Sequence, residues 1–271
     1  MKVAALQTVS TPDLDENLAV ARSLLERAAA QGAELAILPE HFGLLGATER
    51  DKLQVQEAFG IGPIQGFLAQ AARDLGLCIV GGTMPLSSGS ADRVYNSSLA
   101  FAGDGNCLAR YDKIHLFSFD NGEEHYDESR VVEPGRSAVT FSLRSRDGHD
   151  WCVGMSVCYD LRFPELYREC SRAGAHLLLA PSAFTYTTGQ AHWEPLIRAR
   201  AIENLCYLAA PAQGGRHRNG RRTWGHSMIV DPWGRVLDTL VEGEGVVVAD
   251  LDMARLVTCR SQLPALGHRV L

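Results

Sequence analysis

Short apolar runs alternate with longer amphipathic segments along this chain. Residues 2–8 (KVAALQT) and 33–40 (AELAILPE) are apolar without polar alternation, which is typical of strands buried on both faces. Between them, residues 13–32 begin with acidic side chains, carry apolar residues at helical spacing and end in glycine, which predicts an amphipathic helix. A second helix is predicted over residues 63–76, which begin with proline and end with glycine.

The same pattern continues to the end of the chain. Helices are predicted over residues 164–174 and 191–205, and residues 117–136, which are polar and contain glycine and proline, are predicted to form a long loop. Further apolar runs predict strands within residues 77–86, 93–102, 107–117, 138–143, 151–158, 175–182, 206–212, 225–233 and 245–252.

This alternation of strands and helices predicts an α/β fold in which helices cover at least one face of each sheet. A barrel, a doubly wound sheet and a two-sheet sandwich all fit the pattern, and periodicity does not decide between them. We find no linker and no low-complexity segment, so we expect one domain over residues 1–271.

Composition and net charge argue against some classes of binding partner. The chain is 46% hydrophobic and 21% charged, as ordinary globular proteins are, and its net charge of −6 argues against nucleic acid or an anionic membrane as a partner. A basic cluster at residues 214–222 (GGRHRNGRR) is predicted to be a solvated loop.

The cysteines and the chain start bear on localisation. The seven cysteines are odd in number, include no C-x-x-C pair and mostly lie in apolar runs, which indicates reduced thiols. The first residues lack the apolar core of a signal peptide, and no apolar run reaches the length of a membrane span. We therefore expect a cytoplasmic protein.

Reactive side chains follow three of the predicted strands, and in α/β folds sites gather at the carboxyl ends of strands. Glu40 directly follows a buried strand, where partial burial would raise its pKa towards the range of a general base. Lys113 could stabilise an oxyanion. The alternatives are a solvated surface acid and a lysine that extends along the sheet edge to water. His115, two residues after Lys113, is expected to be structural.

The third reactive side chain is Cys158. It would lie at the end of the strand predicted over 151–158, close to the helix that begins at Pro164, and N–H groups at a helix start lower the pKa of a thiol. Cys152 would share its face of that strand, but only Cys158 would lie at the strand end. A buried structural thiol is the alternative; it is left open for Cys259 and is the role expected of Cys78, Cys107, Cys152, Cys170 and Cys206.

Glu40, Lys113 and Cys158, in this order, resemble the Glu-Lys-Cys triad of the nitrilase superfamily of carbon–nitrogen hydrolases. The matching stretches are LPE, YDKIHLF and CYDLRFPELYR, and further likeness lies in TGQAHWEPLIRARAIENLCY and WGHSMIVDPWG, so the resemblance covers nearly the whole chain. It implies a four-layer α-β-β-α sandwich that forms a homodimer or a higher homo-oligomer, with no metal and no organic cofactor.

The resemblance also implies a mechanism. Cys158 would attack an amide carbonyl, and Lys113 with the backbone N–H of Tyr159 would stabilise the oxyanion. Glu40 would move the protons, so that a thioester forms and is hydrolysed to a carboxylic acid, with release of ammonia or an amine. The family has a second, supporting glutamate in the loop after the lysine. Glu128 is the best match for it, and Glu123 and Glu124 are rivals.

The segment after the cysteine is similar to the amidase branches of the superfamily. Within them, ARAIENLCYLAAPAQGGRH and SQLPALGHR resemble the deaminated-glutathione amidases, which implies a small-molecule amide substrate. The alternatives are an ω-amidase that acts on 2-oxoglutaramate and a non-catalytic binding protein on the same fold.

Three residues are candidates for binding the substrate. Arg162 could hold a substrate carboxylate, because a guanidinium matches that group bidentately, or it could form a structural ion pair with Glu165 or Asp160. Phe184 and Thr187, in the segment 184–190, are expected to line the pocket.

Overall fold

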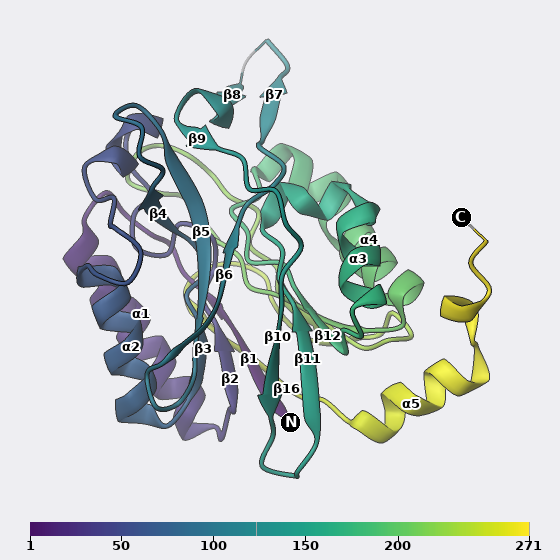
Figure 1. Cartoon of the computed structure of the whole chain (residues 1–271). Helices are drawn as coiled ribbons and strands as arrows, with labels where there is room; N and C mark the ends of the chain where they lie inside the picture. The colour runs from purple at the N-terminus through teal and green to yellow at the C-terminus, as the bar shows by residue number, and fades with distance from the viewer. Residues whose placement is uncertain (123, 271) are drawn as a thin grey trace.

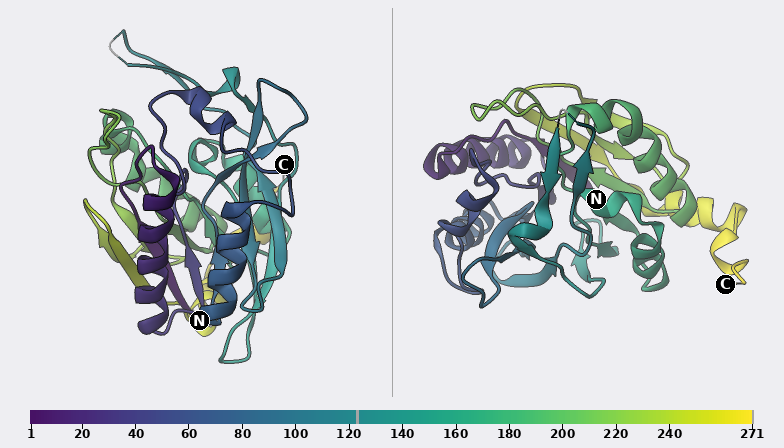
Figure 2. Two further views of the ribbon diagram at one scale, coloured as in Figure 1. Left: turned by 90° about the vertical axis from the view of Figure 1, so that its left-hand side faces the viewer. Right: turned by 90° about the horizontal axis from the view of Figure 1, so that it is seen from above.

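The computed structural model describes residues 1–122 and 124–270, and it consists of two β-sheets packed face to face with helices outside each (Figures 1 and 2). The first sheet has eight strands in the order β16-β1-β2-β3-β5-β4, with β6 and β9 also paired to β5. Their bounds are β1 Lys2–Gln7, β2 Leu35–Ile37, β3 Cys78–Val80, β4 Met84–Ser87, β5 Val94–Phe101, β6 Cys107–Asp112, β9 Val132–Glu133 and β16 Gly245–Asp250.

The second sheet has six strands in the order β10-β11-β12-β13-β14-β15. Their bounds are β10 Thr140–Arg144, β11 Asp150–Gly154, β12 Leu177–Leu179, β13 Tyr207–Ala210, β14 Ser227–Val230 and β15 Val236–Leu240. Three neighbouring strands run parallel in each sheet, β1-β2-β3 in the first and β11-β12-β13 in the second. Their carboxyl ends therefore lie along one edge of each sheet, where the loops that carry function gather.

Two helices cover the outer face of each sheet. Helices α1 (Leu14–Ala30) and α2 (Pro63–Leu75) pack on the first sheet, and α3 (Pro164–Arg172) and α4 (Tyr186–Asn204) pack on the second. Local sequence explains their ends: the Asp13 side chain caps α1 by accepting from the Glu16 N–H, and α2 begins at a proline and ends at Gly76 in the left-handed conformation.

Strand β1 shows why these strands are apolar without alternation. Val3 and Ala5 belong to the core between the two sheets, whereas Ala4 and Leu6 belong to the core under α1 and α2. All four are fully buried. The predicted α/β class and the four-layer α-β-β-α sandwich are thus confirmed, and the sandwich replaces the barrel and the doubly wound sheet that the pattern left open.

Several local predictions were wrong. The strand predicted over 151–158 ends at Gly154, so Cys152 and Cys158 do not share a strand; Cys158 begins the short 3-10 helix η3 (Cys158–Arg162). The predicted loop at 117–136 contains the hairpin of β7 (Ser118–Asp120) and β8 (His125–Asp127), the 3-10 helix η2 (Glu128–Arg130) and β9. Helix α4 begins at Tyr186, five residues earlier than predicted, because the polar residues 186–190 also belong to it.

The last helix, α5 (Met253–Gln262), was not predicted. It follows β16 and leads away from the sandwich, with the C-terminal residues beyond it (Figure 1). None of the helices among the described residues is long and apolar enough to cross a membrane.

Candidate active site

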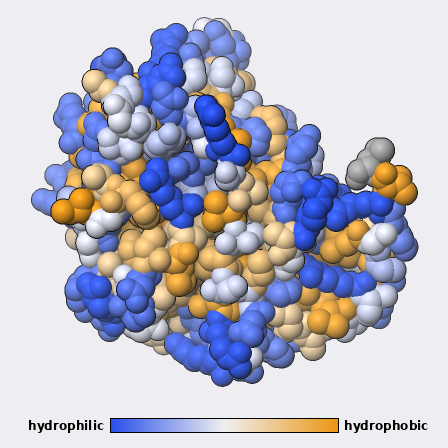
Figure 3. All heavy atoms as spheres, viewed as in Figure 1, coloured by the Kyte–Doolittle hydropathy of each residue, from blue (hydrophilic) through white to orange (hydrophobic). Residues whose placement is uncertain are grey.

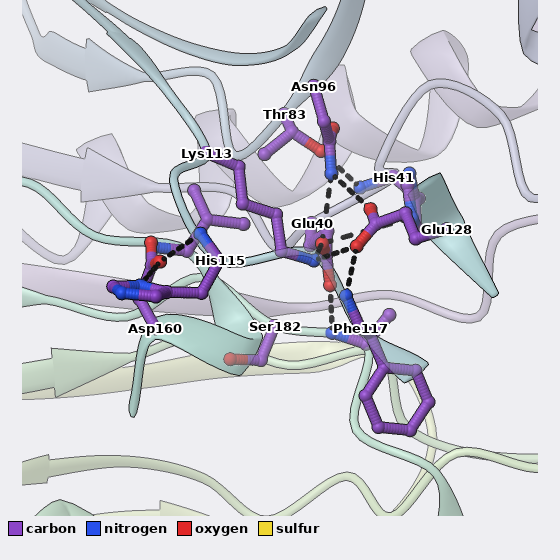
Figure 4. A network of polar contacts seen from close by, with 12 residues as sticks. Glu40, His41, Thr83, Asn96, Lys113, His115, Phe117, Glu128, Asp160 and Ser182 are labelled. Atoms are coloured by element: carbon purple, nitrogen blue, oxygen red, sulfur yellow. Dashed lines mark hydrogen bonds and ion pairs between the residues drawn. The ribbon is translucent and has the colours of Figure 1, made fainter. Parts of the chain in front are cut away.

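Three charged side chains from distant parts of the chain meet inside the protein (Figure 4). Glu40 follows β2, Lys113 follows β6 and Glu128 begins η2, and their exposed fractions are 2%, 1% and 7%. The chain passes very close to itself here: a Cβ at Gly82 would lie 1.9 Å from the Pro39 carbonyl oxygen, so only glycine fits beside the residue that precedes Glu40.

Lys113 lies between the two carboxylates. Its Nζ donates to Glu40 Oε1 at 2.9 Å and to Glu128 Oε2 at 2.8 Å. Glu128 Oε2 also accepts from the Phe117 N–H at 2.9 Å, and Glu40 Oε2 accepts from the Ala183 N–H at 2.9 Å. These bonds compensate for the loss of water around all three buried charges.

Asn96 is a site residue that sequence reasoning missed. It lies in the middle of β5, and its Nδ2 donates to Glu40 Oε1 at 3.0 Å and to Glu128 Oε1 at 3.3 Å. One amide therefore connects both carboxylates, on top of the connection through Lys113. The only sequence signal was a polar residue inside an apolar strand, and such residues are also common in ordinary sheets.

The charge of Lys113 decides the ionisation of its neighbours. Burial alone would raise the pKa of Glu40, but Lys113 outweighs it and lowers the pKa of that carboxyl to about 2. Burial likewise opposes the charge on Lys113, yet Glu128 and Glu40 keep the pKa of the ammonium well above its usual value. The predicted net rise in the pKa of Glu40 was therefore wrong, because the prediction counted the burial but not the paired lysine.

Cys158 lies beside this cluster at the first residue of η3. Its backbone has a φ of 50°, a left-handed conformation that residues other than glycine rarely adopt. Its N–H donates to the Pro181 carbonyl at 3.0 Å. Burial first, and then the charge and hydrogen bond of Glu40, raise the pKa of the thiol well above its usual value, although Lys113 opposes them.

The prediction that the pKa of the Cys158 thiol is lowered was thus wrong. The helix start that was expected to lower it, at Pro164, lies six residues beyond the sulfur-bearing residue. A protonated thiol now stands next to an ionised carboxylate. This pair is a proton donor and a proton acceptor in contact, so Glu40 can take the thiol proton when the sulfur forms a bond.

Asp160 fixes the turn that carries Cys158. It is fully buried, and it accepts from the Val157 N–H at 2.8 Å, from the Tyr111 hydroxyl at 2.6 Å and from the His115 N–H at 3.0 Å. His115 also contacts it through Nδ1 at 2.7 Å, which agrees with the structural role expected of that histidine. The contacts with Tyr111 and His115 join the segment that carries Lys113 to the segment that carries Cys158.

A cavity of about 530 Å³, partly open to solvent, lies over these residues. Its walls include Glu40, Lys113, Glu128, Cys158, Tyr159, Arg162, Phe184, Thr185 and Thr188. Thr187, in contrast, is exposed on α4 and donates to Glu124 Oε2 at 3.0 Å. The structure therefore places Thr187 outside the cavity, and the prediction that it lines the pocket was wrong. At the start of α4 it is Thr185 and Thr188 that face the cavity.

Arg162 lines the cavity. Its guanidinium lies 5.6 Å from the centre of the Phe184 ring and 5.8 Å from that of Tyr159. Within residues 1–122 and 124–270, no carboxylate forms an ion pair with it: Asp160 is engaged by other donors, and Glu165 makes no such contact. Its Nη1 contacts His192 Nδ1 at 3.3 Å, and without a carboxylate partner the guanidinium is available to an anion in the cavity.

The loop after Lys113 offered three glutamates. Glu128 contacts Lys113 directly, whereas Glu124 bonds to Thr187 and Tyr126. Glu123 lies outside the described residues. The structure therefore brings Glu128, and not Glu124, into the cluster.

The basic segment 214–222 is only partly a solvated loop. Arg218 is exposed and pairs with Glu16, but Arg221 lines the cavity and pairs with Glu49 at 3.1 Å. His41, next to Glu40, lines the cavity too, and burial lowers its pKa to about 4, so its ring is neutral near pH 7. Neither Arg221 nor His41 was expected in the site.

Ligand atoms of Glu40, His41 and Glu128 lie within 4.8 Å of one another, as the donors of a metal site would. The Lys113 ammonium, however, already bonds to both carboxylates. A cation therefore already stands between the two negatively charged donors, and these residues do not fit a metal ion.

Known proteins resemble this chain over almost its full length. Residues 2–261 match the family model described as carbon-nitrogen hydrolase. A deaminated glutathione amidase from Synechocystis is 44% identical over 269 residues, which cover 98% of this chain and 97% of that protein.

Two solved structures share the fold. The NitFhit protein of Caenorhabditis elegans has a TM-score of 0.89 and 35% identity over 99% of this chain, which spans 65% of that protein. A mutant amidase from Nesterenkonia sp. AN1 has a TM-score of 0.79 and 28% identity, covering 97% of this chain and 98% of that one; acrylamide has added to its active-site cysteine.

Proposed function

Because the chain belongs to the carbon–nitrogen hydrolase family, we propose that it hydrolyses a linear amide through a cysteine thioester, with deaminated glutathione as its substrate. The amidases among its relatives, from Synechocystis to mouse, are 38–44% identical and make the chain a hydrolase of carbon–nitrogen bonds other than peptide bonds. One observation carries the mechanism: the Cys158 thiol, the Glu40 carboxylate and the Lys113 ammonium meet in one cavity.

In the first step, Cys158 Sγ bonds to the amide carbonyl carbon and its proton passes to Glu40. The negative charge that develops on the carbonyl oxygen is stabilised by Lys113 and by the Tyr159 N–H. An ammonium has three N–H donors, and Lys113 uses two of them on Glu40 and Glu128, which leaves one for the oxygen. Tyr159 is the second residue of η3, where backbone N–H groups lack partners within the helix.

In the second step, Glu40 gives the proton to the leaving nitrogen, the carbon–nitrogen bond breaks and the acyl group stays on sulfur as a thioester. Glu40 then takes a proton from water, the resulting hydroxide attacks the thioester, and the sulfur leaves with a proton as the thiol. The products are a carboxylic acid and an amine. Glu128 and Asn96 act as positioning residues, since they hold Lys113 and Glu40 without reaching the reacting atoms.

The relatives and the charge of the cavity support this substrate. Deaminated glutathione is a 2-oxo acid joined through an amide to cysteinylglycine, so it carries a carboxylate at each end. Arg162, which has no carboxylate partner among the described residues, suits one of them. Phe184 supplies an apolar wall beside it.

A single assay compares this substrate with 2-oxoglutaramate, the substrate of the alternative ω-amidase function, because both release 2-oxoglutarate. We expect a higher kcat/KM for deaminated glutathione; a preference for 2-oxoglutaramate would favour the alternative. Absence of turnover with any amide would favour a non-catalytic binding protein.

Two cysteine variants complete the test. Cys158→Ala should abolish hydrolysis and retain the fold. Cys152→Ala removes a half-buried thiol on β11, outside the cavity, and should leave hydrolysis intact.

We further propose that the chain is one domain, acts in the cytoplasm without a metal or organic cofactor and forms a homodimer. Free cysteines, with none in a disulfide among the described residues, support a reducing compartment. Apolar side chains gather over the middle of the face seen in Figure 3, and Trp233, Val257 and Leu263 are exposed, which supports self-association. Sedimentation velocity would test the dimer.

A further inference from the structure

A second, small pocket lies next to the cavity of Cys158. Three residues line both spaces: His41, Glu49 and Arg221. The wall between the two spaces is therefore made of these side chains. Beyond them, the second pocket is formed by the segment that follows Glu40, including Thr48 and Lys52.

The main contact in this wall is the ion pair between Arg221 and Glu49. Arg221 Nη1 donates to Glu49 Oε1 at 3.1 Å, and the guanidinium lies 5.0 Å from the centre of the Tyr126 ring. Glu49 also accepts from Lys52 Nζ at 2.7 Å. Burial opposes its charge, but Lys52 and then Arg221 lower the pKa of Glu49 to about 2. Glu49 thus keeps a cationic partner even when Arg221 turns to another anion.

The reaction places the amine part of the substrate on this side of the cavity. Glu40 must touch the leaving nitrogen to protonate it, and the chain runs from Glu40 directly into His41. The His41 Nε2 lies 3.9 Å from Glu40 Oε1, and the same ring lines the second pocket. The acyl part is then left to Arg162, which lies on the same short helix as Cys158 and lines the same cavity.

We propose that Arg221 determines specificity for the amine part of the substrate: it binds a carboxylate there and exchanges Glu49 for it. Because a guanidinium holds a carboxylate through paired, charge-assisted bonds, the site would prefer amides of amino acids or short peptides with a free carboxylate over amides of neutral amines. This inference rests on the proposed function and names the part of the substrate that the function leaves unassigned.

The test uses two substrates that differ only in this carboxylate: deaminated glutathione and its analogue with a C-terminal carboxamide. Both release 2-oxoglutarate, so one assay gives kcat and KM for each. Arg221→Gln should lower the ratio of kcat/KM for the acid over the carboxamide about 10- to 100-fold, mainly through KM, since a hydrogen bond to a charged group is lost. Arg221→Lys should restore part of the ratio.

Arg218→Gln is the matched control. Arg218 belongs to the same loop but pairs with Glu16 outside the cavity, so its loss should not change the ratio. Glu49→Gln should move the ratio in the opposite direction to Arg221→Gln, because the competing carboxylate is gone. This second variant keeps the test decisive if Arg221→Gln does not fold.

The proposal would be overturned if Arg221→Gln lowered kcat/KM equally for the acid and the carboxamide. It would also be overturned if the ratio of the two kcat/KM values were unchanged in both Arg221→Gln and Glu49→Gln. An equally large loss on 2-oxoglutaramate would overturn it too, because that result would place Arg221 on the acyl side. These outcomes leave the proposed function standing. If the wild-type protein hydrolyses none of these amides, the proposed function fails and the inference fails with it.

Discussion

Replacing Glu128 with glutamine removes one of the two carboxylates that balance the buried charge of Lys113. Among the described residues, both oxygens of Glu128 accept only from N–H donors: Oε2 from Lys113 and the Phe117 amide, Oε1 from Asn96. A glutamine at this position must therefore point its own NH₂ at one of these donors. The substitution loses a charge–charge interaction and at least one hydrogen bond, with almost no change in volume.

The magnitude follows from the burial of the pair. Breaking a buried ion pair by removing one partner costs about 3–5 kcal/mol. Lys113 keeps Glu40 as a partner at 2.9 Å, so we expect the low end, about 3 kcal/mol of unfolding free energy. Urea denaturation at pH 7 measures this as a lower midpoint with an unchanged slope. Because Lys113 also loses its orientation towards the oxyanion, kcat should fall about 100-fold or more.

Glu124→Gln is the matched control, because Glu124 is the described rival in the same loop. It accepts from the exposed Thr187 hydroxyl at 3.0 Å and from the half-buried Tyr126 hydroxyl at 3.4 Å, both neutral groups. We expect its loss to change stability by less than about 1 kcal/mol. The reasoning would be refuted if Glu124→Gln were as damaging as Glu128→Gln, or if Glu128→Gln left both stability and kcat unchanged.

Three further predictions concern the neighbours of this pair. Asn96→Ala should lower the unfolding free energy by about 1.5–3 kcal/mol in urea denaturation, because its amide donates to two buried carboxylates; a change below about 0.5 kcal/mol would contradict this. His41 has a folded pKa of about 4 against a usual 6.5, so the unfolded chain binds the proton first, and stability is full above pH 6.5 and falls towards pH 4. Asparagine tolerates the left-handed φ of 59° at this position, so His41→Asn should fold and should reduce the loss of stability between pH 7 and pH 5. If the loss of stability were unchanged, groups other than His41 would be its cause. Glu40→Gln should lower the apparent pKa of Cys158 in an alkylation rate profile although turnover is lost, with the exposed Cys107 as internal control; an unchanged or higher pKa would count against the proximity of the two groups.

Sequence patterns predicted the inner strands and the early helices well, because strands such as β1, β2, β3, β12 and β13 are buried on both faces and each early helix has clear end signals. Strand β1 and helix α1 were expected within two residues of their observed bounds. The pattern was weaker at the end of β11, where the apolar run continues past Gly154 although the chain has already left the sheet. The pattern reports burial, and residues 155–158 are buried in a turn rather than in a strand.

The candidate site was predictable in its residues but not in its electrostatics. Glu40, Lys113 and Cys158 stand out by their positions after apolar runs and by family likeness. The pKa directions of the carboxyl and the thiol depend on which charges lie within about 3–4 Å across the fold, and local sequence does not contain those distances. Arg221 was missed for the same reason, since nothing in its basic loop distinguishes it from Arg218 until the pairing with Glu49 is known.

The central claim is that Cys158 carries the acyl group during turnover. Acid quench within the first turnover, with enzyme and deaminated glutathione at similar concentrations, followed by digestion and tandem mass spectrometry, locates that group. The account predicts a 2-oxoglutaryl adduct on Cys158, and neither adduct nor product with Cys158→Ala. An acyl group on any other residue, or product formation by Cys158→Ala, would contradict it.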